Sequence, residues 1–223
     1  MYTCAHCAVK ACYNNTKDKM PQNCPMREPE LYVGLPEVYH EEENLRIFQE
    51  SAQIEHDGYC QWNRVYETIE FIKRMEYKLV GIAFCVGLQR EAAVFDRLLR
   101  AHGIKTCSLI CKNGGFDKND FGIADENKLK GCGYEAACNP VGQAKLLAAA
   151  GTDFNVVIGL CVGHDTLFFK YTETPFTVLV VKDRVLGHNP CAALYGAEGY
   201  FKGEGYFRKK FGLPPADQLN KNK

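Results

Sequence analysis

The sequence of 223 residues lacks an excess of either charge, a long apolar run and a phosphate-binding loop. Its 27 Lys and Arg residues balance 27 Asp and Glu residues, so we expect no nucleic-acid partner and no anionic membrane surface. The longest apolar stretches, 79–88 and 154–163, fall well short of the roughly twenty residues that cross a bilayer. Neither GxGxxG nor a GxxxxGKS/T loop occurs, which leaves nucleotide binding without support.

The N-terminus, MYTCAHCAVKAC, also lacks the apolar core of a signal peptide. We therefore expect a cytoplasmic protein in a reducing compartment, where thiols stay free. The twelve cysteines are unusual in that setting, although they fall short of the density of a disulfide scaffold. Because a chain of this length can bury a core without staples, the composition favours a metalloprotein. An anaerobic source would suit thiolate–iron sites.

Short apolar segments alternate with amphipathic ones from residue 77 onward. Helices are predicted over 38–55, 63–75, 89–102 and 140–150, and strands over 79–84, 104–110, 155–160 and 176–181, with a short partner strand at 185–187. The alternation is typical of an α/β fold with a mostly parallel, Rossmann-like sheet sandwiched by helices. We expect a cysteine-rich metal-binding arm over 1–36, an α/β domain with N-terminal helices over 37–212, and a flexible tail over 213–223.

The first cysteine cluster lies in the N-terminal arm. Its spacing is Cys4-x2-Cys7-x4-Cys12-x11-Cys24, and the two-residue gap lets both sulfurs of the first pair reach one metal. Structural zinc sites and iron–sulfur clusters use similar spacings. The segment has few large apolar residues, so metal binding would supply its folding energy. The structural alternative is a set of incidental thiols or a pair of disulfides.

A second set of cysteines follows the predicted strands. Cys85, Cys111 and Cys161 come at the ends of the first three strands, and Cys138 precedes the helix that begins at Pro140. Sites in open α/β sheets form beyond the carboxyl ends of the strands, so these four sulfurs are predicted to meet at one rim and hold a [4Fe–4S] cluster. The alternative is that each thiol packs as a small buried hydrophobe.

The remaining cysteines and four polar residues near the predicted rim receive individual interpretations. Cys107 is interpreted as core, Cys132 and Cys191 as reserve ligands, and Cys60 has no evident partner. His164, Asp165, Arg184 and His188 are candidates for catalysis or for shaping a pocket at the rim. Their structural alternatives are helix capping by His164 and Asp165, and a solvated turn at 182–184.

Four motifs carry a family resemblance: FCVGL at 84–88, CNPVGQA at 138–144, GLCVGHD at 159–165 and VVKDRVLGHNP at 180–190. Together with the N-terminal cysteines they resemble DUF1847, an uncharacterised family found largely in anaerobic bacteria and archaea. The resemblance implies metal binding but no reaction. It favours the motif residues Cys4, Cys7, Cys12, Cys24, Cys85, Cys138, Cys161, His164 and His188.

Three functions follow from these features. The first is an iron–sulfur protein with a redox or electron-transfer role, acting on a redox partner or a small molecule. The second is a zinc-stabilised ligand- or partner-binding module without catalysis. The third is thiol chemistry by Cys161 with His164 as its base. Whether the protein is an enzyme, and whether it forms oligomers, stays open at this level.

Overall fold

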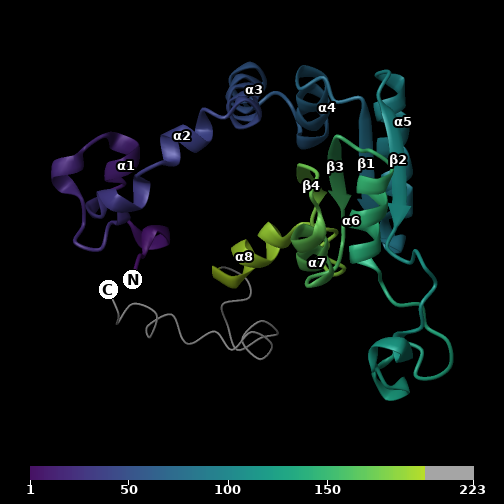
Figure 1. Ribbon diagram of the computed structural model, residues 1–223. Coiled ribbons are helices and arrows are strands. Elements are labelled where there is room, and N and C mark those ends of the chain that lie inside the picture. Colours follow the sequence, from purple (N-terminus) through teal and green to yellow (C-terminus); the bar gives the residue numbers. More distant parts are fainter. Residues whose placement is uncertain (199–223) are drawn as a thin grey trace. The chain divides into compact units, whose positions relative to one another are not determined.

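The computed structural model describes residues 1–198, in two compact units divided between Gln61 and Trp62 (Figure 1). The predicted tail at 213–223 lies outside the described residues. No helix within residues 1–198 combines the length and the apolar character that a membrane span requires.

The first unit consists of short helical turns followed by one long helix. Its elements are 3-10 turns at Cys4–His6, Lys17–Lys19, Pro25–Arg27 and Pro29–Tyr32, and helices α1 (Ala11–Asn14), α2 (Leu35–Tyr39) and α3 (Glu42–Gly58). Prolines begin several of these turns, because proline suits the first helical position but not the interior. The single helix predicted over 38–55 is wrong at its start: Glu41 is extended (φ −59°, ψ 136°) and separates α2 from α3.

The second unit is an α/β sheet structure. Its elements are α4 (Arg64–Arg74), β1 (Leu79–Phe84), α5 (Gln89–Ala101), β2 (Lys105–Ile110), α6 (Pro140–Ala149), β3 (Phe154–Ile158), α7 (His164–Tyr171), β4 (Phe176–Val180) and α8 (Pro190–Glu198). The four strands are all parallel, in the order β2-β1-β3-β4. The predicted mostly parallel α/β sheet is therefore confirmed, as is the adjacency of the first and third strands.

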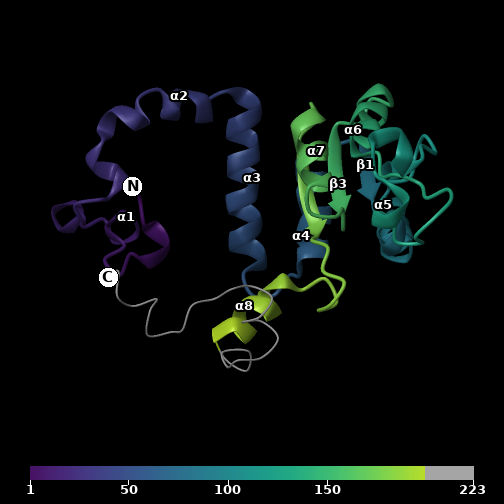
Figure 2. The same ribbon diagram turned by 90° about the horizontal axis from the view of Figure 1, so that it is seen from below.

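The strand order explains why helices cover both faces of the sheet. The chain steps from β1 to β2 in one direction and from β2 across β1 to β3 in the other. Right-handed crossovers consequently place α5 and α6 on opposite faces. Contacts and views agree: α4 and α5 pack against one face, and α6 and α7 against the other (Figures 1 and 2).

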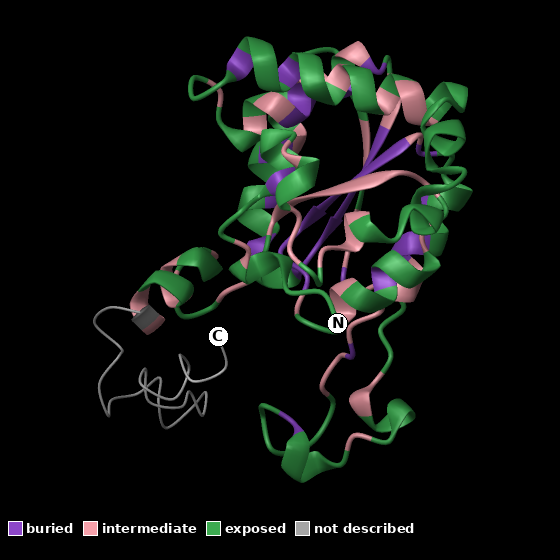
Figure 3. Cartoon of the chain, turned by 90° about the vertical axis from the view of Figure 1, so that its left-hand side faces the viewer, coloured by how far each residue is buried: buried purple, intermediate pink, exposed green. Residues whose placement is uncertain are grey.

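The core is concentrated on the two central strands. Every residue of β3 is buried, as are all residues of β1 except the first, whereas β2 and β4 are partly exposed (Figure 3). Gly81 in β1 allows a close approach, since a Cβ there would lie 1.9 Å from Asn155 Oδ1. Asn155 is fully buried and its Oδ1 accepts from Thr152 Oγ1 at 3.0 Å.

The predicted partner strand at 185–187 is wrong, because this segment is a turn. Asp183 Oδ1 accepts from the backbone N–H groups of Val185 and Leu186, each at 2.8 Å, which engages the donors that a strand would need. Gly187 and His188 then take positive φ values of 60° and 65°. Helices α7 and α8 are additions to the elements predicted from the sequence.

Candidate functional site

The candidate site lies where the direction of the strand connections reverses. From β1 the chain leads to β2 on one side, and from β3 it leads to β4 on the other. Such a switch point opens a crevice beyond the carboxyl ends of the two central strands. Cys85 directly follows β1, and Cys161 lies three residues beyond β3. The two loops that flank this crevice therefore each carry a cysteine.

Three of the four rim cysteines lie in a row. Cys111 Sγ is 3.9 Å from Cys138 Sγ, and the Cys111 thiol also hydrogen-bonds with Cys85. Cys85 and Cys111 are buried, with 5% and 2% of their surface exposed, whereas Cys138 is half-buried. The structure thus brings together three of the four sulfurs that the sequence placed at this rim. The hydrogen bond that the structure gives for the Cys161 sulfur is with Arg184 instead of another cysteine.

Cationic side chains contact two of the four rim sulfurs, one at an end of the row and one outside it. Lys182 Nζ donates to Cys85 Sγ at 2.7 Å, and Arg184 Nη2 donates to Cys161 Sγ at 2.9 Å. Both cations come from the loop after β4, which the sequence analysis took most simply for a solvated turn. Their pairing with sulfur was missed because nothing in the local sequence distinguishes such a turn from one that folds back over the rim.

These contacts divide the three clustered thiols into two that ionise readily and one that does not. The hydrogen bond with Cys111 and then the Lys182 ammonium lower the pKa of Cys85 to about 4. The hydrogen bond with Cys111, supported by Lys112 and His164, lowers the pKa of Cys138 to about 5. Hydrogen bonds with both neighbours raise the pKa of Cys111. The central sulfur keeps its proton while the two flanking sulfurs are thiolates at neutral pH.

Amides fix the backbone around this row. Asn139 N–H donates to Cys111 O at 2.7 Å, and Asn139 Nδ2 donates to Asn113 Oδ1 at 3.0 Å. Gln143 on α6 is fully buried, and its Nε2 donates to Phe84 O (3.1 Å) and Leu109 O (2.7 Å). These two carbonyls lie at the ends of β1 and β2, just before Cys85 and Cys111. Because these bonds tie α6 to the ends of β1 and β2, the positions of the sulfurs are set by the sheet.

Of the four predicted polar candidates, two lie near the sulfurs and two stabilise local backbone. Arg184 contacts Cys161, and His164 is half-buried and contributes to the lowered pKa of Cys138. Asp165 Oδ1 accepts from Gly163 N (3.0 Å) and Thr166 N (2.7 Å), which is a helix-start role. His188 Nδ1 accepts from Asp183 N at 3.1 Å, so this nitrogen serves the turn.

The N-terminal cysteines lie in the first unit. A tight turn joins Cys4 and Cys7, with Cys7 N–H donating to Cys4 O at 3.1 Å, and Lys10 N–H donates to Cys7 Sγ at 3.4 Å. Asn23 Nδ2 donates to Thr3 Oγ1 at 2.6 Å, so the residues just before Cys4 and Cys24 are in contact. Cys4 and Cys12 are exposed, and Cys7 and Cys24 are half-buried.

No three or more Cys, His, Asp or Glu side chains among residues 1–198 are arranged around a single metal-ion position. The rim sulfurs form a row instead of a shell. Of the remaining cysteines, Cys60, Cys132 and Cys191 are exposed, and Cys107 packs against the core as predicted. The ligand sets therefore stay predictions.

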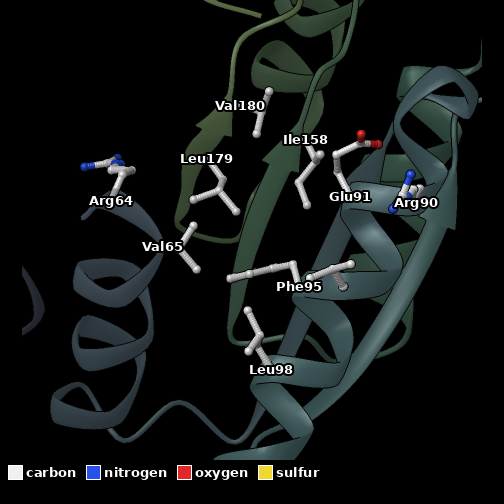
Figure 4. A pocket seen from close by; sticks show the side chains of 10 residues that line it. Arg64, Val65, Arg90, Glu91, Phe95, Leu98, Ile158, Leu179 and Val180 are labelled. Atoms are coloured by element: carbon white, nitrogen blue, oxygen red, sulfur yellow. The ribbon is translucent and has the colours of Figure 1, made fainter. Parts of the chain in front are cut away.

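A pocket of about 370 Å³ lies between α4 and α5, on one face of the sheet (Figure 4). Its wall is mainly apolar, formed by Val65, Val94, Phe95, Leu98, Ile158, Leu179 and Val180, with Arg64, Arg90 and Glu91 at its border. A β-bulge explains why consecutive residues Leu179 and Val180 both line it, since the register of β4 against β3 shifts at this point. The Ile158 carbonyl accepts from Cys85 N–H at 3.1 Å, so the pocket wall adjoins the cysteine site.

Comparison with known proteins gives a family. The DUF1847 family, described as protein of unknown function, matches residues 24–179, more than half of the chain. The chain belongs to the DUF1847 family. A relative described as "Uncharacterized protein MJ0455", from Methanocaldococcus jannaschii, is 43% identical over 192 residues, covering 86% of this chain and 93% of the relative. No solved structure matches.

The DUF1847 match confirms the family resemblance, and it includes three of the four motifs, the motif at 180–190 lying beyond it. It includes Cys24 and all four rim cysteines but not Cys4, Cys7, Cys12, Lys182 or Arg184. Neither description names an activity or a metal. For this DUF1847 protein, function therefore has to be argued from the site.

Proposed function

We propose that the protein binds a thiolate-ligated metal centre at the carboxyl edge of its sheet, and that this centre is an iron–sulfur cluster with a redox or electron-transfer role. The ligands would be Cys85, Cys111, Cys138 and Cys161. The observation that carries the proposal is the convergence of three thiols from separate loops, with Cys111 in contact with both Cys85 and Cys138. Two of these thiols have lowered pKa values, and thiolate is the form that ligates metal.

One sulfur–sulfur separation at the rim fits thiolate ligation of a metal ion. Tetrahedral thiolates around one ion, with metal–sulfur bonds of about 2.3 Å, have sulfurs about 3.8 Å apart. The separation of 3.9 Å between Cys111 and Cys138 matches that edge. A cluster is wider than a single ion, so the half-buried sulfurs of Cys138 and Cys161 would move outward to hold it. When bound, the cluster would supply one-electron chemistry, and Lys182 and Arg184 would tune it by hydrogen bonds to sulfur.

Anaerobic reconstitution with iron and sulfide tests the proposal. Visible absorption, electron paramagnetic resonance, and iron, zinc and acid-labile sulfide per chain would be measured for the parent and for a Cys138→Ala/Cys161→Ala variant. The matched control is Cys107→Ala/Cys132→Ala, which removes two cysteines from neighbouring segments. We expect the rim variant to lose cluster iron and sulfide and the control to retain them. Equal uptake by the rim variant and the parent would refute the rim as a cluster site.

We further propose that Cys4, Cys7, Cys12 and Cys24 bind a second centre, with zinc ahead of iron–sulfur. Support comes from the Cys4–Cys7 turn, in which a backbone N–H already donates to Cys7 Sγ. Limited proteolysis with and without zinc would be compared in the parent and a Cys7→Ser variant. Zinc should protect residues 1–61 of the parent only; protection that survives Cys7→Ser would contradict this set.

The second candidate function is a zinc-stabilised ligand-binding module without catalysis. The apolar pocket between α4 and α5 favours it, because its volume is within the range of small-molecule sites. If reconstituted protein held zinc at the arm and no iron at the rim, this function would take precedence. The iron and sulfide counts above decide between the two.

A further inference from the structure

We propose that Cys111 and Cys138 form a reversible disulfide when the metal-free protein meets a hydroperoxide, with Cys138 as the thiol that is attacked first and Cys111 as the thiol that resolves it. The inference concerns the same rim but does not require the cluster. A protein that forms this bond and takes up no iron would refute the proposed function while supporting the disulfide.

The geometry of the two residues suits a bond. Their sulfurs are 3.9 Å apart, and a disulfide needs a separation of about 2.0 Å, which is a side-chain adjustment of about 2 Å. Their backbones are already bridged, because Asn139 N–H donates to Cys111 O at 2.7 Å. Asn113 Nδ2 adds a bond to Asn139 O at 3.1 Å. The chain therefore needs little further ordering to bring the sulfurs together.

Burial gives the two thiols different roles. Cys111 is 2% exposed, so an oxidant in solvent reaches it poorly. Cys138 is half-buried and precedes the first turn of α6, where solvent has access. An accessible thiol beside a shielded partner is the arrangement of a peroxide-responsive pair.

The chemistry balances in two steps. The Cys138 sulfur attacks the hydroperoxide, the O–O bond breaks, and Cys138 becomes a sulfenic acid while the peroxide leaves as an alcohol or as water. The Cys111 sulfur then attacks the sulfenic sulfur, forming the S–S bond and releasing one water that carries away the Cys111 proton. Two thiols lose two electrons in total, and one hydroperoxide gains them. A thiol reductant reverses the bond by exchange.

The bond would close the rim to metal, since it removes two of the four proposed ligands at once. It would also covalently fasten the loop after β2 to the start of α6. Disulfides in a reducing compartment are transient and respond to oxidant. Oxidation of the pair would therefore prevent metal binding at the rim until the bond is reduced. Cys85 would keep its Lys182 contact in either state.

The test is peptide mapping of full-length, metal-free protein. Trypsin leaves Cys107 with Cys111 in peptide 106–112, and Cys132 with Cys138 in peptide 131–145. A Cys107→Ser/Cys132→Ser background therefore makes the assignment unique. After chelation, reduction and desalting without oxygen, the protein would be treated with one equivalent of hydrogen peroxide, alkylated and digested without reduction. We expect two free thiols to be lost and the two peptides to be joined, and dithiothreitol to separate them.

Two variants in the same background assign the roles. In Cys111→Ala, the sulfenic-acid probe dimedone should label Cys138; in Cys138→Ala, Cys111 should stay unlabelled and keep its thiol. Circular dichroism confirms that each variant is folded, and Cys111→Ser replaces Cys111→Ala if the latter is not. Absence of the joined peptides in folded protein, a dominant Cys85–Cys111 link, or labelling of Cys111 ahead of Cys138 would each overturn the inference.

Discussion

Removing the charge of Lys182 should raise the pKa of Cys85 without disturbing the fold. Lys182 Nζ lies 2.7 Å from Cys85 Sγ. Unit charges at that distance attract by ~1.5 kcal/mol in water and by ~6 kcal/mol at an effective dielectric constant of 20. Lys182 is half-buried and its side chain is still reached by solvent, so screening favours the lower value. At about 1.4 kcal/mol per pKa unit, Lys182→Met should raise the pKa of Cys85 by about one to two units.

The assay is the ultraviolet absorbance of thiolates in reduced, metal-free protein, titrated between about pH 3 and pH 8. Two thiols should ionise in this window, because the pKa values of Cys85 and Cys138 are lowered to about 4 and about 5. In Lys182→Met one of the two steps moves upward and the other stays. Lys145→Met, on an exposed position of α6, is the matched control and should leave both steps in place. An unchanged titration in Lys182→Met, or an equal shift in the control, would refute the electrostatic account of the rim.

Three further outcomes are expected. Gly81→Ala should destabilise the protein by about 2–5 kcal/mol in urea unfolding, because its Cβ would meet Asn155 Oδ1 at 1.9 Å; adding Asn155→Ala should recover part of this loss, and a purely additive double variant would count against the clash. Asn139→Ala should lower the free energy of unfolding by more than the roughly 1 kcal/mol typical of losing an N-cap. Asn63 only caps α4, so Asn63→Ala should lower it by about that value. Equal losses in the two variants would mean that the hydrogen bonds of Asn139 across the rim do not stabilise the fold. Cys138 should react with iodoacetamide at about pH 6 roughly five- to tenfold faster than an ordinary free cysteine, because its larger thiolate fraction outweighs its lower nucleophilicity; a rate at or below that of free cysteine would contradict the lowered pKa.

Sequence patterns sufficed for the sheet and for the place of the site. Each strand is a short apolar run, and parallel pairing puts all carboxyl ends at one edge, so a cysteine after β1 and another after β2 must lie near each other. Cys138 could be placed because it directly precedes Asn139 and Pro140, which start α6. These inferences use only chain order and the direction of the strands.

The contacts at the rim could not be predicted in the same way. Lys182 and Arg184 reach their sulfurs because the loop after β4 folds back through the turn at Asp183. The conformation of that loop depends on long-range packing and not on a local pattern. The pocket was missed for a similar reason, since the bulge at Leu179 changes which side chains face α4 and α5.

The cations also bear on whether the rim cysteines are merely small core residues. A thiol that only fills space needs no charged neighbour, and Ala or Val would pack as well. Holding an ammonium against a buried, neutral thiol costs desolvation that only a charged partner offsets. Lys182 donates to a sulfur that is 5% exposed, and Arg184 donates to a second sulfur from the same loop. The Lys182 contact is favourable when the Cys85 sulfur carries negative charge, in line with its lowered pKa. Thiolate is the form that ligates a metal or reacts with an oxidant.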